Sequence, residues 1–183
     1  MLRVVAHEQS KQIWVRIAAI AVFVVLMAIS AKISIPLEPV PFTLQVLVVL
    51  LSGMVLGWRD ALIAQVAYVG FIALGAPIDA RGVGAAALFG ATGGFLFGFM
   101  PAAAITGFLV ERATAKTLWL RWIAGLVGVV VIYIFGVSHY MLYKGVIFEE
   151  AFKLVLQPFI VLDMVKAIFA AGLTESARTL FKK

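Results

Sequence analysis

Residues 158–173 read Pro-Phe-Ile-Val-Leu-Asp-Met-Val-Lys-Ala-Ile-Phe-Ala-Ala-Gly-Leu, an apolar segment that carries one acidic and one basic side chain, Asp163 and Lys166. Three residues along a helix is a rotation of about 300°, so both side chains point to nearly the same face. Ionisable groups inside a membrane helix are costly unless they pair with each other or line a polar cavity. The segment therefore predicts either an ion pair that holds helices together or a site for a small polar ligand, an ion or a relayed proton.

The composition of the whole chain indicates an integral membrane protein. Of its 183 residues, 64% are apolar and 13% are charged, and the mean hydropathy is +1.11. A soluble domain has about 45–50% apolar and about 25% charged residues. The net charge of +6 comes from basic residues beside apolar segments, so we expect contact with membrane lipid and not with nucleic acid. Cysteine is absent from the sequence, which excludes disulfides and thiolate metal sites.

The apolar runs predict one all-α membrane domain over residues 1–183 with six transmembrane helices, because a helix needs about 20 mostly apolar residues to cross a bilayer. The expected spans are residues 13–31, 43–58, 61–75, 84–110, 119–143 and 158–180. Only Arg59 and Asp60, which we expect to form a tight turn, separate the second span from the third. The alternative for this region is a single bent element.

The distribution of Lys and Arg predicts that both termini are cytoplasmic, because basic residues concentrate on the inner side of a membrane. With six spans, the side of the termini holds Arg3, Lys11, Arg16, Arg59, Arg112, Lys116, Arg121, Arg178, Lys182 and Lys183. The opposite side holds Lys32, Arg81, Lys144 and Lys153, and Lys166 lies within the membrane. We therefore expect a multi-pass protein of the plasma membrane.

The three loops on the outer side have features that favour recognition. Residues 35–42 contain three prolines, which hold the chain extended, and residues 144–157 are expected to include a short interfacial helix. Pro158 suits the first turn of the last helix. At 1.5 Å of rise per residue, Asp163 then lies about 7–9 Å below the outer end of that helix. The charged pair should therefore be reached from outside.

Other polar side chains near the outer face are candidate ligand contacts. Thr43 and Gln45 offer neutral hydrogen bonds at the mouth of the second span, although Thr43 also suits a helix cap. Arg81 is the strong cation of its loop and suits a carboxylate; the alternative is an exposed charge paired with Asp79. Thr92 lies where the glycine-rich stretch can open the helix and present backbone groups to a ligand.

Glycine spacing and the lack of catalytic motifs complete what the residues predict. Gly90, Gly94 and Gly98 recur every four residues, so we expect one stripe at which helices approach closely. His7 and His139 are isolated, no group of side chains has metal-ligand spacing, and no Walker sequence is present. The residues therefore give little support to an enzyme, and we expect no cofactor, no metal and no ATPase motif in this chain.

Four motifs together resemble the BioY family over nearly the whole chain, in the same order and spacing. They are Pro39–Gln45 (Pro-Val-Pro-Phe-Thr-Leu-Gln), Tyr68 through Gly75-Ala76-Pro77, the glycine-rich Gly90–Phe99, and Pro158-Phe159-Ile160 followed by Asp163 and Lys166. BioY proteins are biotin-binding S components of energy-coupling-factor (ECF) vitamin transporters. The resemblance implies an S-component fold, capture of biotin from outside, and assembly with a T component and two cytoplasmic ATPases.

The resemblance also implies roles for individual side chains. Asp163 would accept hydrogen bonds from the ureido N–H groups of biotin, and Lys166 would donate to the ureido carbonyl. Thr43, Gln45 and Thr92 would add neutral hydrogen bonds, Tyr68 and phenylalanines would cover the ring and tail, and Arg81 would meet the carboxylate. The alternatives are an S component for another small vitamin and a stand-alone ion-coupled carrier that uses Asp163 as its coupling group.

Overall fold

The computed structural model describes the backbone of residues 2–113 and 117–180 and the side chains of residues 12–113 and 117–179. Lys116, Lys182 and Lys183, which contribute to the predicted orientation, lie outside the described residues. The side chains of Arg3, His7 and Lys11 lie outside them as well.

Helices make up most of the fold, as predicted. They are α1 (Leu2–Lys32), α2 (Gln45–Leu56), α3 (Trp58–Ala73), α4 (Ala86–Phe89), α5 (Gly93–Arg112), α6 (Leu118–Lys144), α7 (Phe148–Val155) and α8 (Ile160–Leu180). A small antiparallel ribbon, β1 (Ser34–Ile35) and β2 (Phe42–Thr43), pairs Ser34 with Thr43 and Ile35 with Phe42. The all-α prediction omitted this ribbon, which closes the proline-rich loop at its base.

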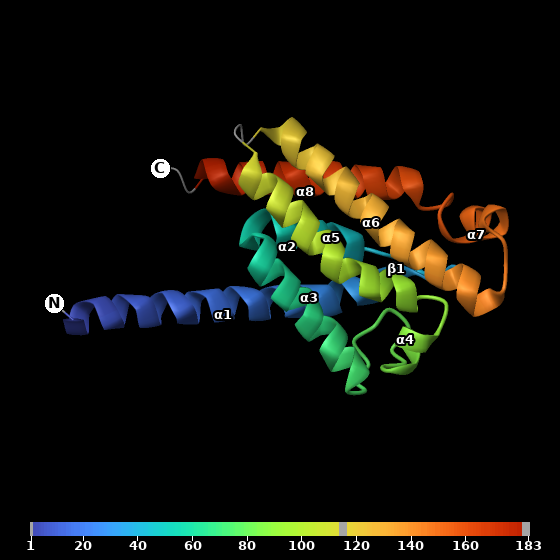
Figure 1. Cartoon of the computed structure of the whole chain (residues 1–183), viewed down its shortest axis with the longest axis horizontal. Helices are drawn as coiled ribbons and strands as arrows, with labels where there is room; N and C mark the ends of the chain where they lie inside the picture. The colour runs from blue at the N-terminus through green and yellow to red at the C-terminus, as the bar shows by residue number, and fades with distance from the viewer. Residues whose placement is uncertain (1, 114–116, 181–183) are drawn as a thin grey trace.

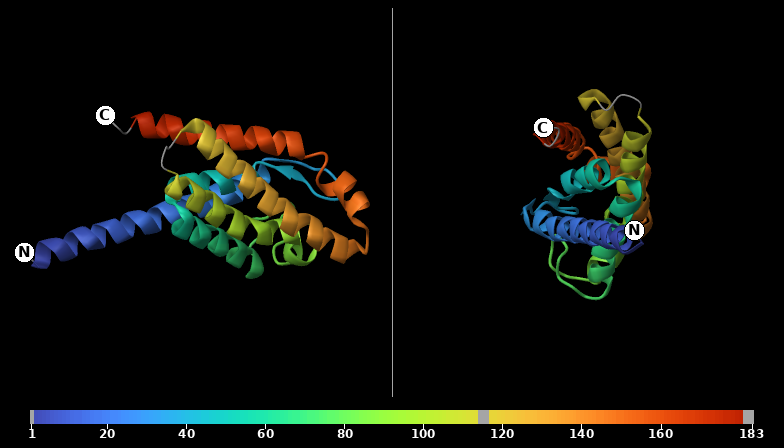
Figure 2. Two further views of the ribbon diagram at one scale, coloured as in Figure 1. Left: turned by 45° about the horizontal axis from the view of Figure 1, so that its top comes forward. Right: turned by 90° about the vertical axis from the view of Figure 1, so that its left-hand side faces the viewer.

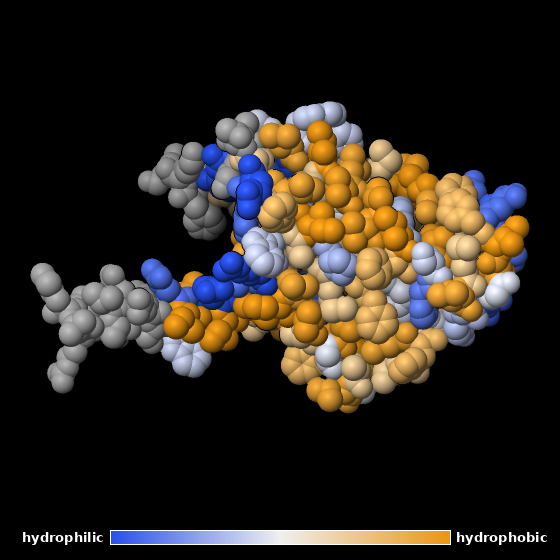
Figure 3. Space-filling model, viewed as in Figure 1, coloured by the Kyte–Doolittle hydropathy of each residue, from blue (hydrophilic) through white to orange (hydrophobic). Residues whose placement is uncertain are grey.

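The helices form one bundle, from which the first half of α1 projects (Figure 1). The two described ends of the chain lie at the same end of the molecule, whereas α4 and α7 lie toward the opposite end (Figures 1 and 2). The β1–β2 ribbon also points toward the α7 end, beside α8 (Figure 2). An apolar surface covers much of the middle of the bundle, and hydrophilic residues gather near both ends (Figure 3). This distribution is the one expected of a membrane protein.

Three helical segments are long and apolar enough to cross a membrane: Gln12–Lys32 in α1, Gly93–Arg112 and Leu118–Lys144. A fourth span results if Phe148–Val155 and Ile160–Thr179, which are bent by 56° relative to each other, are counted together. The helix α2 has 12 residues and α3 has 16, less than the usual length of a span. Length and composition thus identify three or four spans among the described residues, where the sequence predicts six.

The predicted turn between the second and third spans is wrong by two residues. The chain turns at Gly57, whose φ of 79° is readily adopted by glycine, and α2 and α3 are separate helices on either side of it. Arg59 and Asp60 therefore lie inside α3. The carboxylate of Asp60 accepts hydrogen bonds of 2.6 and 2.9 Å from the guanidinium of Arg16, which fastens α1 to α3.

The predicted span over residues 84–110 is interrupted between α4 and α5, at residues 90–92. Beyond this break, Gly94 and Gly98 of α5 pack directly against α6. A Cβ atom at Gly94 would collide with the Phe135 carbonyl and the His139 side chain, and one at Gly98 would approach Phe135 Cβ to 3.0 Å. Gly90 precedes the helix and does not share this stripe; its carbonyl lies 3.0 Å from His139 Nε2.

Candidate ligand-binding site

The side chains of Asp163 and Lys166 are paired and buried on α8. The Lys166 ammonium donates a 2.6 Å hydrogen bond to Asp163 Oδ1, and the two residues are only 3% and 5% exposed. The same ammonium donates a 2.8 Å hydrogen bond to the Thr43 carbonyl of β2. It also lies 3.8 Å from the centre of the Phe42 ring, within the range of a cation–π interaction. The pair thus connects α8 to the ribbon.

The second carboxylate oxygen of Asp163 is held by Tyr133 of α6. The tyrosine hydroxyl donates a 2.6 Å hydrogen bond to Asp163 Oδ2, so α6 and α8 share this carboxylate. The sequence does not single out Tyr133, because one tyrosine in an apolar helix carries no pattern that marks a site. Only the fold brings it next to Asp163, which lies 30 residues away in the chain.

Asp163, Lys166 and Tyr133 lie in the wall of one cavity, whose empty volume is about 630 Å³ including the part open to solvent. Four other side chains predicted as ligand contacts also line it: Thr43, Gln45, Arg81 and Thr92. Asp79, beside Arg81, lines it as well. The remaining wall consists of Val40, Pro41, Phe42, Val46, Ala80, Phe95, Leu96, Phe99, Ile132 and Phe159.

The apolar part of the wall offers flat surfaces to a ligand. The rings of Phe42 and Phe159 lie nearly parallel, with centroids 6.3 Å apart and an angle of 7° between their planes. Phe95 and Phe99 of α5 contribute from another side. An apolar cavity with a few convergent polar groups is the usual form of a small-molecule site, because the apolar groups supply affinity and the polar ones fix the orientation.

At the rim of the cavity, the guanidinium of Arg81 pairs with Glu38 and not with the side chain of Asp79. Its guanidinium donates a 3.0 Å hydrogen bond to Glu38 Oε2 and a 2.8 Å hydrogen bond to the Pro39 carbonyl. Asp79 is 2% exposed and instead accepts from the backbone N–H groups of Arg81 and Gly84, at 3.0 and 2.7 Å. The loop of residues 74–85 is therefore folded around Asp79, and the Arg81 guanidinium connects it to the proline-rich loop.

Tyr68 lies outside the cavity wall. It is fully buried in α3, and its hydroxyl accepts a 2.9 Å hydrogen bond from Gln45 Nε2 and donates a 3.0 Å hydrogen bond to the Ile78 carbonyl. The structure therefore brings six of the seven predicted contacts to one cavity and puts Tyr68 behind its wall. Thr92, at the start of α5, donates to the Ala87 carbonyl at 3.3 Å.

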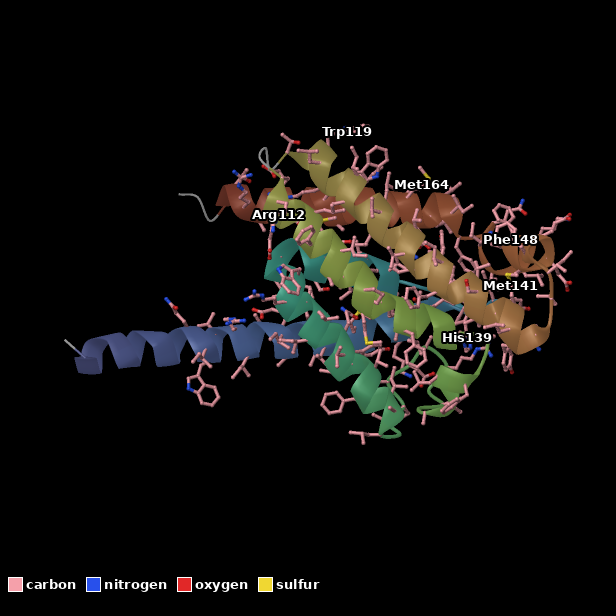
Figure 4. The ribbon with its side chains drawn as sticks, in the orientation of Figure 1. Arg112, Trp119, His139, Met141, Phe148 and Met164 are labelled. Carbon is pink, nitrogen blue, oxygen red and sulfur yellow. The ribbon has the colours of Figure 1, made fainter. Side chains whose placement is uncertain are left out.

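A second hollow, between α6, α7 and α8, has an almost wholly apolar lining that includes Met141, Phe148 and Met164 (Figure 4). Tyr133 lines this hollow as well as the first cavity. Its side chain is thus part of the wall that separates the charged pair from the apolar hollow.

The arrangement can bind a small molecule that carries both hydrogen-bond donors and acceptors at one end. A carboxylate accepts from N–H groups and an ammonium donates to a carbonyl, and both are available in a site with little exposure to water. The apolar middle suits a hydrocarbon body, and the Arg81 guanidinium at the rim suits an anion.

Comparison with known proteins identifies the family. The model of the BioY family matches residues 6–183. A protein of Thermotoga maritima named biotin transporter BioY is 40% identical over 151 residues, which are 82% of this chain and 88% of that one. A probable biotin transporter BioY of Pyrococcus horikoshii is 37% identical over 160 residues, 87% of this chain and 93% of that one.

The fold also matches a solved structure. The crystal structure of the S-component for biotin from an ECF-type ABC transporter superposes with a TM-score of 0.85, covering 92% of this chain and 93% of that one, at 22% sequence identity. The predicted S-component fold is therefore confirmed. From the sequence matches over nearly its full length, this chain belongs to the BioY family.

Proposed function

We propose that this chain is the substrate-binding S component of an ECF-type transporter and that it captures biotin on the outer face of the plasma membrane. The observation that carries the proposal is the buried Asp163–Lys166 pair in the wall of a largely apolar cavity. The names of its relatives support the choice of ligand, because several are biotin transporters.

The chemistry of biotin suits the cavity from one end to the other. Asp163 accepts from the ureido N–H groups, and Lys166 donates to the ureido carbonyl. Phe42 and Phe159 cover the bicyclic ring, and Thr43, Gln45 and Thr92 supply neutral hydrogen bonds. Arg81, at the rim, pairs with the carboxylate of the valeryl tail. Ligand binding thus replaces some of the hydrogen bonds that these side chains make with one another.

The proposed topology has six crossings, with both termini in the cytoplasm and the cavity open to the outside. In this topology α2 and α3 cross as short helices, and α7 lies at the outer interface. The location of both described chain ends at one end of the molecule supports an even number of crossings (Figure 1). A T component and two cytoplasmic ATPases would supply the energy for inward release.

The identity of the ligand is tested by mass spectrometry of small molecules extracted from the purified protein. We expect biotin in an amount close to one molecule per chain when the cells are grown with biotin. If another vitamin is found in that amount instead, the substrate of the site is that vitamin and not biotin. Uptake by vesicles that contain this chain alone, with and without a proton gradient, separates the S component from an ion-coupled carrier.

Replacing Tyr133 by phenylalanine is expected to weaken biotin binding by about 10- to 100-fold, because a hydrogen bond to a charged group contributes about 1.5–3 kcal/mol. The ring and its packing remain, but Asp163 Oδ2 loses its donor. The measurement is the dissociation constant of labelled biotin. Tyr143→Phe in the same helix, where the side chain stacks on His139 away from the cavity, is the control, and equal affinities in the two variants would contradict the role of Tyr133.

Replacing Glu38 by glutamine is expected to strengthen biotin binding by about 2- to 5-fold. Glu38 has an exposed carboxylate that forms an ion pair with Arg81. It therefore competes with the carboxylate of the ligand for the guanidinium. The gain is small because exposed ion pairs contribute only about 0–1 kcal/mol. Glu149→Gln, which removes an exposed carboxylate paired with Lys153 on α7, should leave the affinity unchanged. Weaker binding by Glu38→Gln would show that the Glu38–Arg81 pair assists binding.

A further inference from the structure

Tyr68 has a position that its predicted role as a ligand contact does not explain. Its side chain is fully buried, and it lies outside the cavity wall. Its hydroxyl nevertheless forms two hydrogen bonds to groups that belong to different parts of the site, Gln45 and the Ile78 carbonyl. A buried hydroxyl with both a donor and an acceptor partner fixes the relative positions of those partners, since breaking either bond leaves a polar group unpaired.

On one side, Tyr68 holds the loop that carries Arg81. Ile78, whose carbonyl accepts from the tyrosine, is three residues before Arg81, and Asp79 between them fixes the backbone of Arg81 and Gly84. Lys32 at the end of α1 adds 2.9 and 2.7 Å hydrogen bonds to the carbonyls of Pro77 and Asp79. These contacts hold residues 77–84 together as one rigid unit. A shift of Ile78 therefore also moves Arg81.

On the other side, Tyr68 is connected to the charged pair. Gln45 Oε1 accepts a 3.2 Å hydrogen bond from the Thr43 hydroxyl, and that hydroxyl accepts one of 3.2 Å from the Gln45 backbone. The Thr43 carbonyl accepts from Lys166 at 2.8 Å. All these groups are buried. One chain of hydrogen bonds thus runs from Lys166 through Thr43, Gln45 and Tyr68 to the loop.

We propose that Tyr68 is a positioning residue whose hydroxyl sets the distance between the two polar ends of the cavity, the Asp163–Lys166 pair and Arg81. The proposal rests on the proposed function, because it assigns the two ends to the ring and the carboxylate of one ligand. Tyr68 touches no ligand. It acts through Gln45 and through the loop, and it determines whether a molecule of the length of biotin engages both ends at once.

The test compares biotin with biotinamide, in which the carboxylate is replaced by a neutral amide, on the wild-type chain and on Tyr68→Phe. The ratio of the two dissociation constants measures the engagement of Arg81 alone. A variant that is merely less stable loses affinity for both ligands equally and leaves this ratio unchanged. Tyr140→Phe, a buried tyrosine of α6 outside the cavity wall, is the matched control.

We expect Tyr68→Phe to lower the preference for biotin over biotinamide by about 5- to 10-fold, the effect of about one net hydrogen bond, and Tyr140→Phe to leave it unchanged. Adding Tyr68→Phe to Arg81→Gln should lower that preference no further, because the two changes act through the same contact. If Tyr68→Phe does not fold, Gln45→Met breaks the same chain of hydrogen bonds and should lower the preference in the same way.

An unchanged preference in the folded variant, or a further full loss on top of Arg81→Gln, would overturn the proposal. Failure of the wild-type chain to bind biotin would be a separate result, which removes the proposed function before Tyr68 is tested.

Discussion

Replacing Lys166 by methionine, or Asp163 by asparagine, is expected to weaken biotin binding by about 10²–10³-fold, because breaking a buried charge pair costs about 3–5 kcal/mol. The two groups are 2.6 Å apart and almost fully buried. Either change removes a hydrogen-bonding partner of the ligand and also leaves the other charge without its counter-ion. The measurement is equilibrium binding of labelled biotin to the purified variants, and affinities within twofold of wild type in both would refute the site.

The double variant, Asp163→Asn with Lys166→Met, separates binding from structural support. The pair also fastens α8 to Tyr133 and to the Thr43 carbonyl, so each single variant should unfold at a lower temperature. Removing both charges together leaves no unpaired ion, and such replacements of buried pairs are often neutral for stability. We therefore expect the double variant to recover thermal stability without recovering affinity. Recovery of binding along with stability would mean that the pair has only a structural role.

A second ion pair, in which the arginine is buried and the glutamate is partly exposed, offers a control at the other end of the bundle. Arg121 of α6 is 3% exposed and pairs with Glu175 of α8, and neither residue lines the cavity. Arg121→Met should lower the melting temperature, as the single variants at Asp163 and Lys166 do, but the folded protein should bind biotin with wild-type affinity. Loss of affinity in this variant would show that any broken pair in the bundle disturbs the site.

Replacing Gly94 by leucine is expected to abolish the folded protein, and replacing it by alanine to destabilise it by about 1–3 kcal/mol or more. The reason is steric: even a Cβ atom would collide with the Phe135 carbonyl and the His139 side chain of α6. A backbone carbonyl cannot move aside as the end of a flexible side chain can. The measurement is thermal unfolding in detergent followed by size-exclusion chromatography.

Gly172 of α8 is the control for this prediction. A Cβ atom there would meet no described atom within 4 Å. In a helix, alanine is more favourable than glycine by about 1 kcal/mol. Gly172→Ala should therefore be at least as stable as wild type. If Gly94→Ala had the same melting temperature as Gly172→Ala, the close approach of α5 to α6 would be wrong.

The helical periodicity of the sequence predicts correctly those features that depend on neighbours in the chain. Asp163 and Lys166 are three residues apart, so any helix brings them together, and the structure pairs them. The helix over residues 148–155 and the interruption near Thr92 follow from local composition in the same way. Gly94 and Gly98 share a face because four residues are close to one helical turn.

Features that depend on contacts between distant segments could not be predicted. Tyr133 is an isolated polar side chain in an apolar helix, and nothing near it in the sequence indicates that it meets Asp163. Arg81 has Asp79 two residues away, but the fold brings it to Glu38, 43 residues away. Tyr68 belongs to a family motif, which indicates importance but does not distinguish a ligand contact from a residue behind the wall.

The measurement that tests the site most directly is an experimental structure of the chain with biotin bound. We predict the ureido ring within hydrogen-bonding distance of both the Asp163 carboxylate and the Lys166 ammonium, with the valeryl tail directed toward Arg81. Density for biotin elsewhere, with the Asp163–Lys166 pair unaltered and out of contact with it, would contradict the account.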